Sequence, residues 1–175
     1  NKIVFDKKFN DFDFQKLSLS HNNQFINLSG VMKDSTYKDF KLDLKDVDIL
    51  IFDLQDVGCR FYTYINSMQD FLETALENHK PLLLLDRPNP NGFYVDGPVL
   101  DLKFKSGVGK QPIPIVYGMT MGEYAMMLLG EKWVSEKANA INAYNITTKP
   151  TADTPFHFMV IKCHSYTHKS KYVLP

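Results

Sequence analysis

Four polar side chains, two of them carboxylates suited to acid–base chemistry, lie within eight residues directly after an apolar run. The stretch DLQDVGCRFYTY, Asp53–Tyr64, places the carboxylates of Asp53 and Asp56 beside the amide of Gln55 and the guanidinium of Arg60. A guanidinium can fix the ionisation of a neighbouring acid or bind an anionic substrate. Aspartates after a strand also cap turns, and an Asp–Arg pair can brace a loop. The stretch therefore indicates a catalytic or binding site. The alternative that these side chains only cap turns and brace a loop stays open.

Two apolar runs carry these acids. Val47–Leu54 and Pro81–Asp86 are short and lack strict alternation, which is typical of strands covered on both faces. Between them, NSMQDFLETALENHK has the i, i+3, i+4, i+7 apolar spacing of an amphipathic helix. Asn66 or Ser67 is expected to cap this helix, with acids in its first turns.

The strand–helix–strand order predicts an α/β fold with parallel strands. Ligands of such sheets bind beyond the carboxyl ends of the strands. Asp53 and Asp86 end the two predicted strands, so both acids are expected at one sheet edge, together with Arg60 and Arg87.

Weaker patterns predict the other elements. Alternation in residues 9–17 favours a strand, residues 18–25 are typical of a polar loop, and IPIVYG (113–118) suggests a third strand. Thr120 and Glu123 have the spacing of a capping box that begins a helix, which Gly130 would end. Residues 156–163 are predicted to form another strand, and residues 87–114 are predicted to form a long loop of the kind that often carries function.

The composition excludes several classes of function. The 175 residues include 20 basic and 20 acidic ones, so a net charge of zero gives no argument for a nucleic-acid partner. No apolar segment is long enough to span a membrane, and the first residues lack the pattern of a signal peptide. Glycine-rich nucleotide-binding motifs are also missing, which weakens the reading as a nucleotide-binding domain. No pattern indicates an oligomeric state.

Cysteine and histidine give a weak signal. The cysteines, Cys59 and Cys163, lie far apart and are more typical of small buried side chains than of a disulfide. His157, His164 and His168 lie close to Cys163 in sequence, which leaves a metal site open. Polar or supporting roles are the expectation for these histidines, and we expect no metal and no cofactor.

Taken together, three blocks resemble one family. DVDILIFDLQDVGCRFYTYINSM, LLLDRPNPNGFYVDGPVLD and PIPIVYGMTMGEYA occur in the order of the signature blocks of the exo-β-N-acetylmuramidase family known as NamZ. The late stretch VIKCHSYTHKSKYVLP is also similar to that family, so the resemblance covers roughly residues 45–175.

The resemblance implies a fold and an activity. It implies a Rossmann-like parallel sheet with flanking helices in residues 1–130, and the start of a second, smaller α+β domain in residues 131–175. It also implies a glycosidase of the bacterial cell envelope, periplasmic or secreted, which removes N-acetylmuramic acid from the non-reducing end of peptidoglycan fragments. The expected partners are therefore muropeptides.

Site residues follow from the matched blocks. We expect Asp86 to be a catalytic acid and Asp53 and Asp56 to be positioning acids. Arg60 would suit the lactyl carboxylate of muramic acid, and tyrosines would contact the sugar. The full set of expected substrate-binding residues is Gln55, Arg60, Tyr62, Tyr64, Arg87, Asn89, Asp96 and Glu123.

Two departures from the family pattern leave an alternative open. Residues 1–46 contain no Glu-His-Gly stretch, whose glutamate is a candidate catalytic carboxylate in the family, and the Ser-Pro-Asn block is absent. The 175-residue chain alone is therefore expected to be inactive. A catalytically inactive muropeptide-binding module, or a degenerate fragment, remains the alternative.

Overall fold

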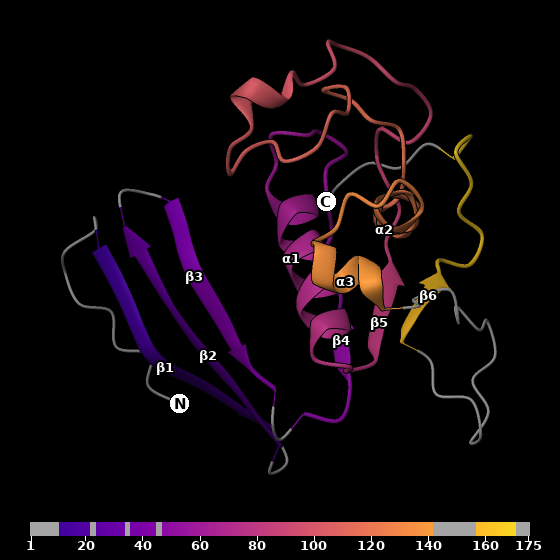
Figure 1. Ribbon diagram of the computed structural model, residues 1–175. Helices are drawn as coiled ribbons and strands as arrows, with labels where there is room; N and C mark the ends of the chain where they lie inside the picture. The colour runs from indigo at the N-terminus through magenta and orange to yellow at the C-terminus, as the bar shows by residue number, and fades with distance from the viewer. Residues whose placement is uncertain (1–10, 22–23, 34–35, 45–46, 142–156, 171–175) are drawn as a thin grey trace. The chain divides into compact units, whose positions relative to one another are not determined.

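The structure is a computed structural model that describes residues 11–21, 24–33, 36–44, 47–141 and 157–170 (Figure 1). The chain divides into two compact units, Asn1–Asp48 and Ile49–Pro175. The expected boundary at residues 130 and 131 stays a prediction.

The first unit contains an antiparallel sheet. It is formed by β1 (Asp11–His21), β2 (Gln24–Lys33) and β3 (Thr36–Asp43), in that order. The strand expected near residues 9–17 is confirmed. The polar loop expected at residues 18–25 is wrong, because Ser18–His21 continues β1 and pairs with the start of β2. The alternation Ser-Leu-Ser in this stretch is itself the period of a strand.

The second unit contains the parallel sheet β4-β5-β6. Its strands are β4 (Leu50–Phe52), β5 (Leu82–Asp86) and β6 (Phe158–Lys162). Its helices are α1 (Tyr64–Glu77), α2 (Met121–Gly130) and α3 (Glu136–Ala140), with a short 3-10 turn η1 (Leu102–Phe104). The predicted α/β fold with parallel strands joined through α1 is therefore confirmed.

The core of this unit lies between the sheet and its helices. Leu82 and Leu84 of β5, Leu72 of α1 and Leu128 of α2 are all fully buried. Ile51, in contrast, is 55% exposed. The expectation that the strands are covered on both faces is therefore wrong for β4, since alternate residues of this strand are buried and exposed.

Helix α1 begins earlier than the sequence predicts. Its N-cap is Thr63, which makes no side-chain capping hydrogen bond, and its first turn contains no acid. Asn66 lies inside the helix, where its Nδ2 donates to the Gly107 carbonyl at 2.6 Å. The asparagine thus fixes the long loop rather than the helix end.

The third strand expected at residues 113–118 is also wrong. This stretch makes only isolated bridges, in which Val116 pairs with Cys59 and with Asp96. Pro112 and Pro114 precede these bridges, and proline has no N–H to donate to a ladder. The loop segments that follow β4 and β5 are nevertheless linked to one another through Val116.

Helix α2 begins with the predicted capping box. The Thr120 hydroxyl accepts from the Glu123 N–H at 3.2 Å, and the Glu123 carboxylate accepts from the Thr120 N–H at 2.8 Å. The helix ends at Gly130, as predicted. Its N-terminus approaches the sheet closely, since a Cβ built at Gly122 would lie 2.5 Å from Cγ1 of Val160.

Replacing Gly122 with Ala should therefore destabilise the fold. Overpacking of this kind costs about 1–3 kcal/mol, because the strand cannot move away without disturbing the core. The matched control is Gly130→Ala, where an added Cβ meets nothing within 4 Å. We expect Gly130→Ala to be neutral or stabilising by at most about 1 kcal/mol. Urea unfolding of both variants checks this, and equal stabilities would contradict the close approach.

Candidate functional site

A pocket of about 480 Å³ lies where β5, β6 and the N-terminus of α2 meet. β5 and β6 are parallel neighbours, and the pocket is at their carboxyl ends, the position expected for a ligand site in such a sheet. Its lining residues are Asp86, Thr120, Gly122, Glu123, Met126, Met159, Val160, Lys162, Cys163, Tyr166, Thr167 and His168.

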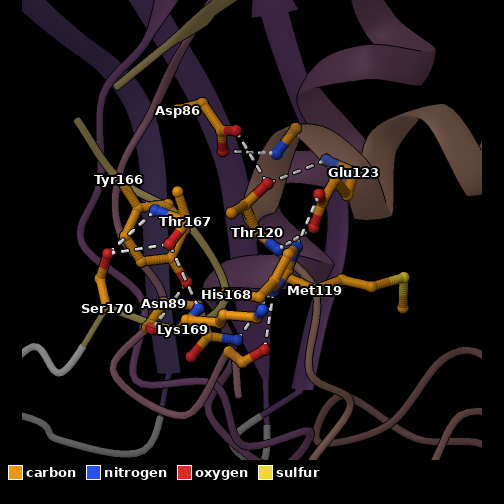
Figure 2. A network of polar contacts seen from close by, with 12 residues as sticks. Asp86, Asn89, Met119, Thr120, Glu123, Tyr166, Thr167, His168, Lys169 and Ser170 are labelled. Atoms are coloured by element: carbon orange, nitrogen blue, oxygen red, sulfur yellow. Dashed lines mark hydrogen bonds and ion pairs between the residues drawn. The ribbon is translucent and has the colours of Figure 1, made fainter. Parts of the chain in front are cut away.

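Asp86 is the half-buried acid of this pocket. Its Oδ2 accepts from the Thr120 hydroxyl and its Oδ1 from the Gly122 N–H, both at 2.8 Å (Figure 2). Burial raises the pKa of the Asp86 carboxyl, and these two hydrogen bonds only partly oppose that effect. The nearby charge of Glu123 raises the pKa further, and that of Lys162 lowers it. A carboxyl group with a raised pKa keeps its proton to a higher pH than an exposed aspartate, which suits it to act as a proton donor.

Glu123 is the second carboxylate of the pocket, and its surroundings shift its pKa in the direction opposite to that of Asp86. Its Oε2 accepts from the Thr120 N–H, and its Oε1 lies 2.9 Å from Nε2 of His168. Burial raises the pKa of Glu123, but the contacts with His168 and Thr120 outweigh it and the pKa is lowered. The pKa values of the two acids in one pocket are thus shifted in opposite directions from their ordinary values, because the surroundings of the two carboxylates differ.

The segment after β6 forms one wall of the pocket. The Tyr166 hydroxyl donates to the Asn89 carbonyl at 3.0 Å, and Nδ1 of His168 lies 2.7 Å from the Gly92 carbonyl. Figure 2 shows these side chains converging with Glu123 and Thr120. Gly92 allows this close approach, since a Cβ there would lie 2.2 Å from the Tyr166 hydroxyl.

Asp53 and Arg87 form a bidentate pair outside the pocket. Nε and Nη2 of Arg87 donate to the two carboxylate oxygens of Asp53 at 2.6 and 2.8 Å. The pairing with Arg87 lowers the pKa of Asp53. Both side chains are partly exposed, so the pair contributes at most about 1 kcal/mol to stability. Its clear effect is to join the loops that follow β4 and β5.

Asp56 is the most deeply buried of the expected acids, with 6% of its surface exposed. Its Oδ2 accepts from the Gly58 N–H at 2.8 Å and from the Tyr117 hydroxyl. Its Oδ1 is buried and has no partner among the described residues. Burial raises the pKa of Asp56, although the Tyr117 and Gly58 contacts oppose this. Burial and the Asp56 charge also raise the pKa of Tyr117.

Arg60 and Gln55 donate to backbone carbonyls. The guanidinium of Arg60 contacts the carbonyls of Pro98, at 2.9 Å, and of Ile113. The Gln55 amide donates to the Pro88 carbonyl at 2.8 Å. Both side chains therefore fasten the long loop to the end of β4.

The remaining expected residues have mixed surroundings. Tyr62 and Tyr64 pack edge to face with ring centroids 5.0 Å apart. Asn89 is buried, and its Nδ2 donates to the Met119 carbonyl at 2.7 Å. Asp96 is exposed, and its Oδ1 accepts from the Gly97 N–H at 2.7 Å.

A comparison with known proteins identifies the family. The family model described as "Exo-beta-N-acetylmuramidase NamZ, N-terminal" matches residues 15–175. The chain belongs to the NamZ family. It is 41% identical over 134 residues to "Peptidoglycan beta-N-acetylmuramidase NamZ" of Bacillus subtilis (strain 168), a match that covers 75% of this chain and 32% of that protein.

Two crystal structures of DUF1343 family proteins from Bacteroides fragilis NCTC 9343 are also similar. The first is 48% identical with a TM-score of 0.63 and covers 75% of this chain and 33% of its own. The second is 38% identical with a TM-score of 0.59 and covers 74% of this chain and 29% of its own. The chain spans about a third of the length of the relatives that it matches.

The pocket contains only part of the predicted site of this NamZ family chain. Asp86 and Glu123 line the pocket together, whereas Asp53, Asp56 and Arg60 do not line it. The other expected residues absent from the lining are Gln55, Tyr62, Tyr64, Arg87, Asn89 and Asp96. The catalytic and substrate-binding roles of all these residues stay predictions.

Sequence reasoning missed several pocket residues. Thr120 was assigned only as a helix cap, yet its hydroxyl also donates to Asp86. Tyr166 and Lys162 lie in the late stretch that is similar to the family, and that similarity alone assigns them no role. His168 was expected to have a polar or supporting role, and its contact with Glu123 is of that kind.

Within the described part of the chain, no group of three or more His, Cys, Asp or Glu could hold a metal ion. No helix there is long and apolar enough to cross a bilayer.

The ion pair between His168 and Glu123 should make stability depend on pH. The contact with Glu123 raises the pKa of His168 above its ordinary 6.5, so this stabilisation is complete below pH 6.5 and is lost as pH rises through the folded-state pKa. The pKa of Glu123 is lowered from 4.5. The stabilisation from the ionised Glu123 is therefore complete above pH 4.5 and is lost as pH falls through the folded-state pKa. The stability difference between wild type and His168→Gln should therefore be largest between pH 4.5 and 6.5.

Both side chains of this pair are 46% exposed, so the difference should stay below about 1 kcal/mol. Urea unfolding of both proteins from pH 4 to 9 measures it. His164→Gln is the matched control, because the His164 ring contacts only the neighbouring Ser165 among the described residues. A difference that is constant over this range would contradict the ion pair.

The two thiols should react at different rates. Cys163 is exposed at the pocket, whereas Cys59 is partly buried, and burial and Asp56 raise its pKa. Because the thiolate is the reactive form, Cys163 should react with iodoacetamide at pH 8 faster by on the order of tenfold. Peptide mapping by mass spectrometry measures both rates, and Cys163→Ser should remove only the fast one. Faster labelling of Cys59 would contradict the described burial.

Proposed function

We propose that the full-length protein is an exo-β-N-acetylmuramidase that releases N-acetylmuramic acid from the non-reducing end of peptidoglycan fragments. The observation that carries this proposal is the 41% identity to a relative named peptidoglycan beta-N-acetylmuramidase. The pocket supports it, because two carboxylates with opposite pKa shifts line one cavity. A bacterial envelope location, with a role in cell-wall recycling, is part of the proposal because peptidoglycan is found there.

Hydrolysis of a glycoside needs a proton donor for the leaving oxygen and a second group that attacks or stabilises the anomeric carbon. In this proposal Asp86 is the proton donor, because burial favours its neutral form. Thr120 and Gly122 orient its carboxyl group. Glu123 stays ionised and its charge favours retention of the proton on Asp86.

The loop-bracing residues have an indirect part in this proposal. The Asp53–Arg87 pair and the Gln55–Pro88 hydrogen bond fix the start of the loop after Asp86. Asn89 then carries the carbonyl that accepts from Tyr166. These contacts hold the pocket wall in place.

Asp86→Asn should lower kcat of the full-length protein about 10²- to 10⁴-fold on a muramic acid disaccharide. The loss should be much smaller on a nitrophenyl muramic acid glycoside, because a good leaving group needs little protonation. The steady-state kinetics of both substrates measure this. Asp101→Asn is the matched control, since Asp101 is exposed and pairs only with Lys103 among the described residues.

Circular dichroism and thermal unfolding of Asp86→Asn separate a catalytic effect from misfolding. Equal losses on the two substrates in a folded variant would contradict a proton-donor role. Full activity would exclude Asp86 from catalysis altogether.

A muropeptide-binding module is the second candidate function. It is the alternative that the sequence motifs leave open. Tight binding of a muropeptide by the full-length protein, without any release of N-acetylmuramic acid over a long incubation, would support this candidate over the hydrolase.

A further inference from the structure

One basic side chain that lines the pocket makes no hydrogen bond or ion pair with the other described residues. The chain has two arginines, and neither lines the pocket. Arg60 donates to the carbonyls of Pro98 and Ile113, and Arg87 holds Asp53. A carboxylate-bearing ligand in this pocket therefore requires another cationic partner.

Lys162 and His168 are the two basic residues that line the pocket. Both ring nitrogens of His168 are engaged, one with Glu123 and one with the Gly92 carbonyl. Lys162 is exposed, and within the described residues its ammonium makes no hydrogen bond or ion pair. Its charge is available to a ligand.

Sheet register places Lys162 beside the expected catalytic acid. Asp86 and Lys162 are paired residues at the ends of the parallel strands β5 and β6. Paired residues on neighbouring strands project to the same side of the sheet. The Lys162 charge also lowers the pKa of Asp86, as expected for a cation close to the carboxyl group.

Part of the pocket lining is apolar. Met126, Met159 and Val160 form this part, so the pocket offers a surface for methyl groups and sugar C–H bonds next to a positive charge. Its volume of about 480 Å³ is that of a small-molecule site. A complementary ligand is a small molecule that carries apolar groups and one anionic group.

We infer that Lys162 forms a carboxylate-binding subsite of this pocket and selects sugars that carry an acidic ether side chain, such as the lactyl group of N-acetylmuramic acid. This inference rests on the proposed function for the identity of the sugar. A lysine is suited to the task, because its ammonium is a compact charge with three donors and a flexible stem. The lactyl methyl would contact the methionine side chains.

The test compares two sugars that differ in the lactyl group. Isothermal titration measures the Kd of the full-length protein for N-acetylmuramic acid and for N-acetylglucosamine. Wild type should prefer N-acetylmuramic acid by about 10- to 100-fold, and Lys162→Gln should reduce this preference at least tenfold by weakening only the acidic sugar. Lys162→Arg should keep most of the preference, since it keeps the charge. Lys137→Gln, on α3 and outside the pocket, is the matched control.

The outcomes separate this inference from the proposed function. Loss of the preference in Lys162→Gln supports the subsite whether or not the wild type cleaves glycosides, and absence of turnover would then contradict only the hydrolase. An unchanged preference in a folded Lys162→Gln variant overturns the subsite, even if the wild type is an active hydrolase. A wild type that binds the two sugars equally also overturns it.

A purely electrostatic role toward Asp86 predicts a different result. Lys162→Gln would then shift the pH profile of kcat and leave the difference in Kd between the two sugars unchanged. That combination would also overturn the subsite.

Discussion

The site depends on the contact between the N-terminus of α2 and the carboxyl end of β5. The Asp86 carboxylate accepts from the first turn of α2 through the Gly122 N–H and the Thr120 hydroxyl. This arrangement needs a residue without a side chain at position 122, because a Cβ there would lie 2.5 Å from Val160 and 3.0 Å from the Asp86 carboxyl group. Gly122 thus serves both the packing of α2 on the sheet and the orientation of the Asp86 carboxyl group. A substitution at this position is expected to disturb both.

The N-terminus of α2 also gives the two pocket acids, Asp86 and Glu123, different surroundings and pKa shifts of opposite direction. Glu123 completes the capping box and contacts His168, so its charge is stabilised by N–H donors and a basic ring. Asp86 also receives two hydrogen bonds, but its burial and the neighbouring charge of Glu123 favour the neutral form. Because both environments originate in the first turn of α2, a short sequence, Thr-Met-Gly-Glu, shifts the pKa values of two carboxylates in one pocket in opposite directions.

How much of this could be predicted from the sequence depends on the range of each contact. The βαβ unit and the capping box are local patterns, and both were predicted at nearly the correct residues. Residues 113–118 have the apolar composition of a strand, but they form only isolated bridges, because Pro114 inside the run has no N–H to donate to a ladder. Contacts such as that between His168 and Glu123, 45 residues apart, have no local signature. Burial, which sets the direction of the pKa shift of Asp86, is likewise a property of the folded chain.

The polar stretch after β4 shows why residue type alone predicted a site but not its members. Two acids, an amide and a guanidinium beyond a strand end suggest chemistry, and the resemblance to a glycosidase family strengthens that suggestion. In the folded chain each of these groups contacts a loop: Asp53 holds Arg87, Gln55 reaches the Pro88 carbonyl, and Arg60 reaches those of Pro98 and Ile113. These loops lead from Asp86 to Thr120 and contain the carbonyls on which Tyr166 and His168 dock. The stretch therefore supports the pocket indirectly. Its side chains do not line the pocket, but they hold in place the loops against which the lining residues pack.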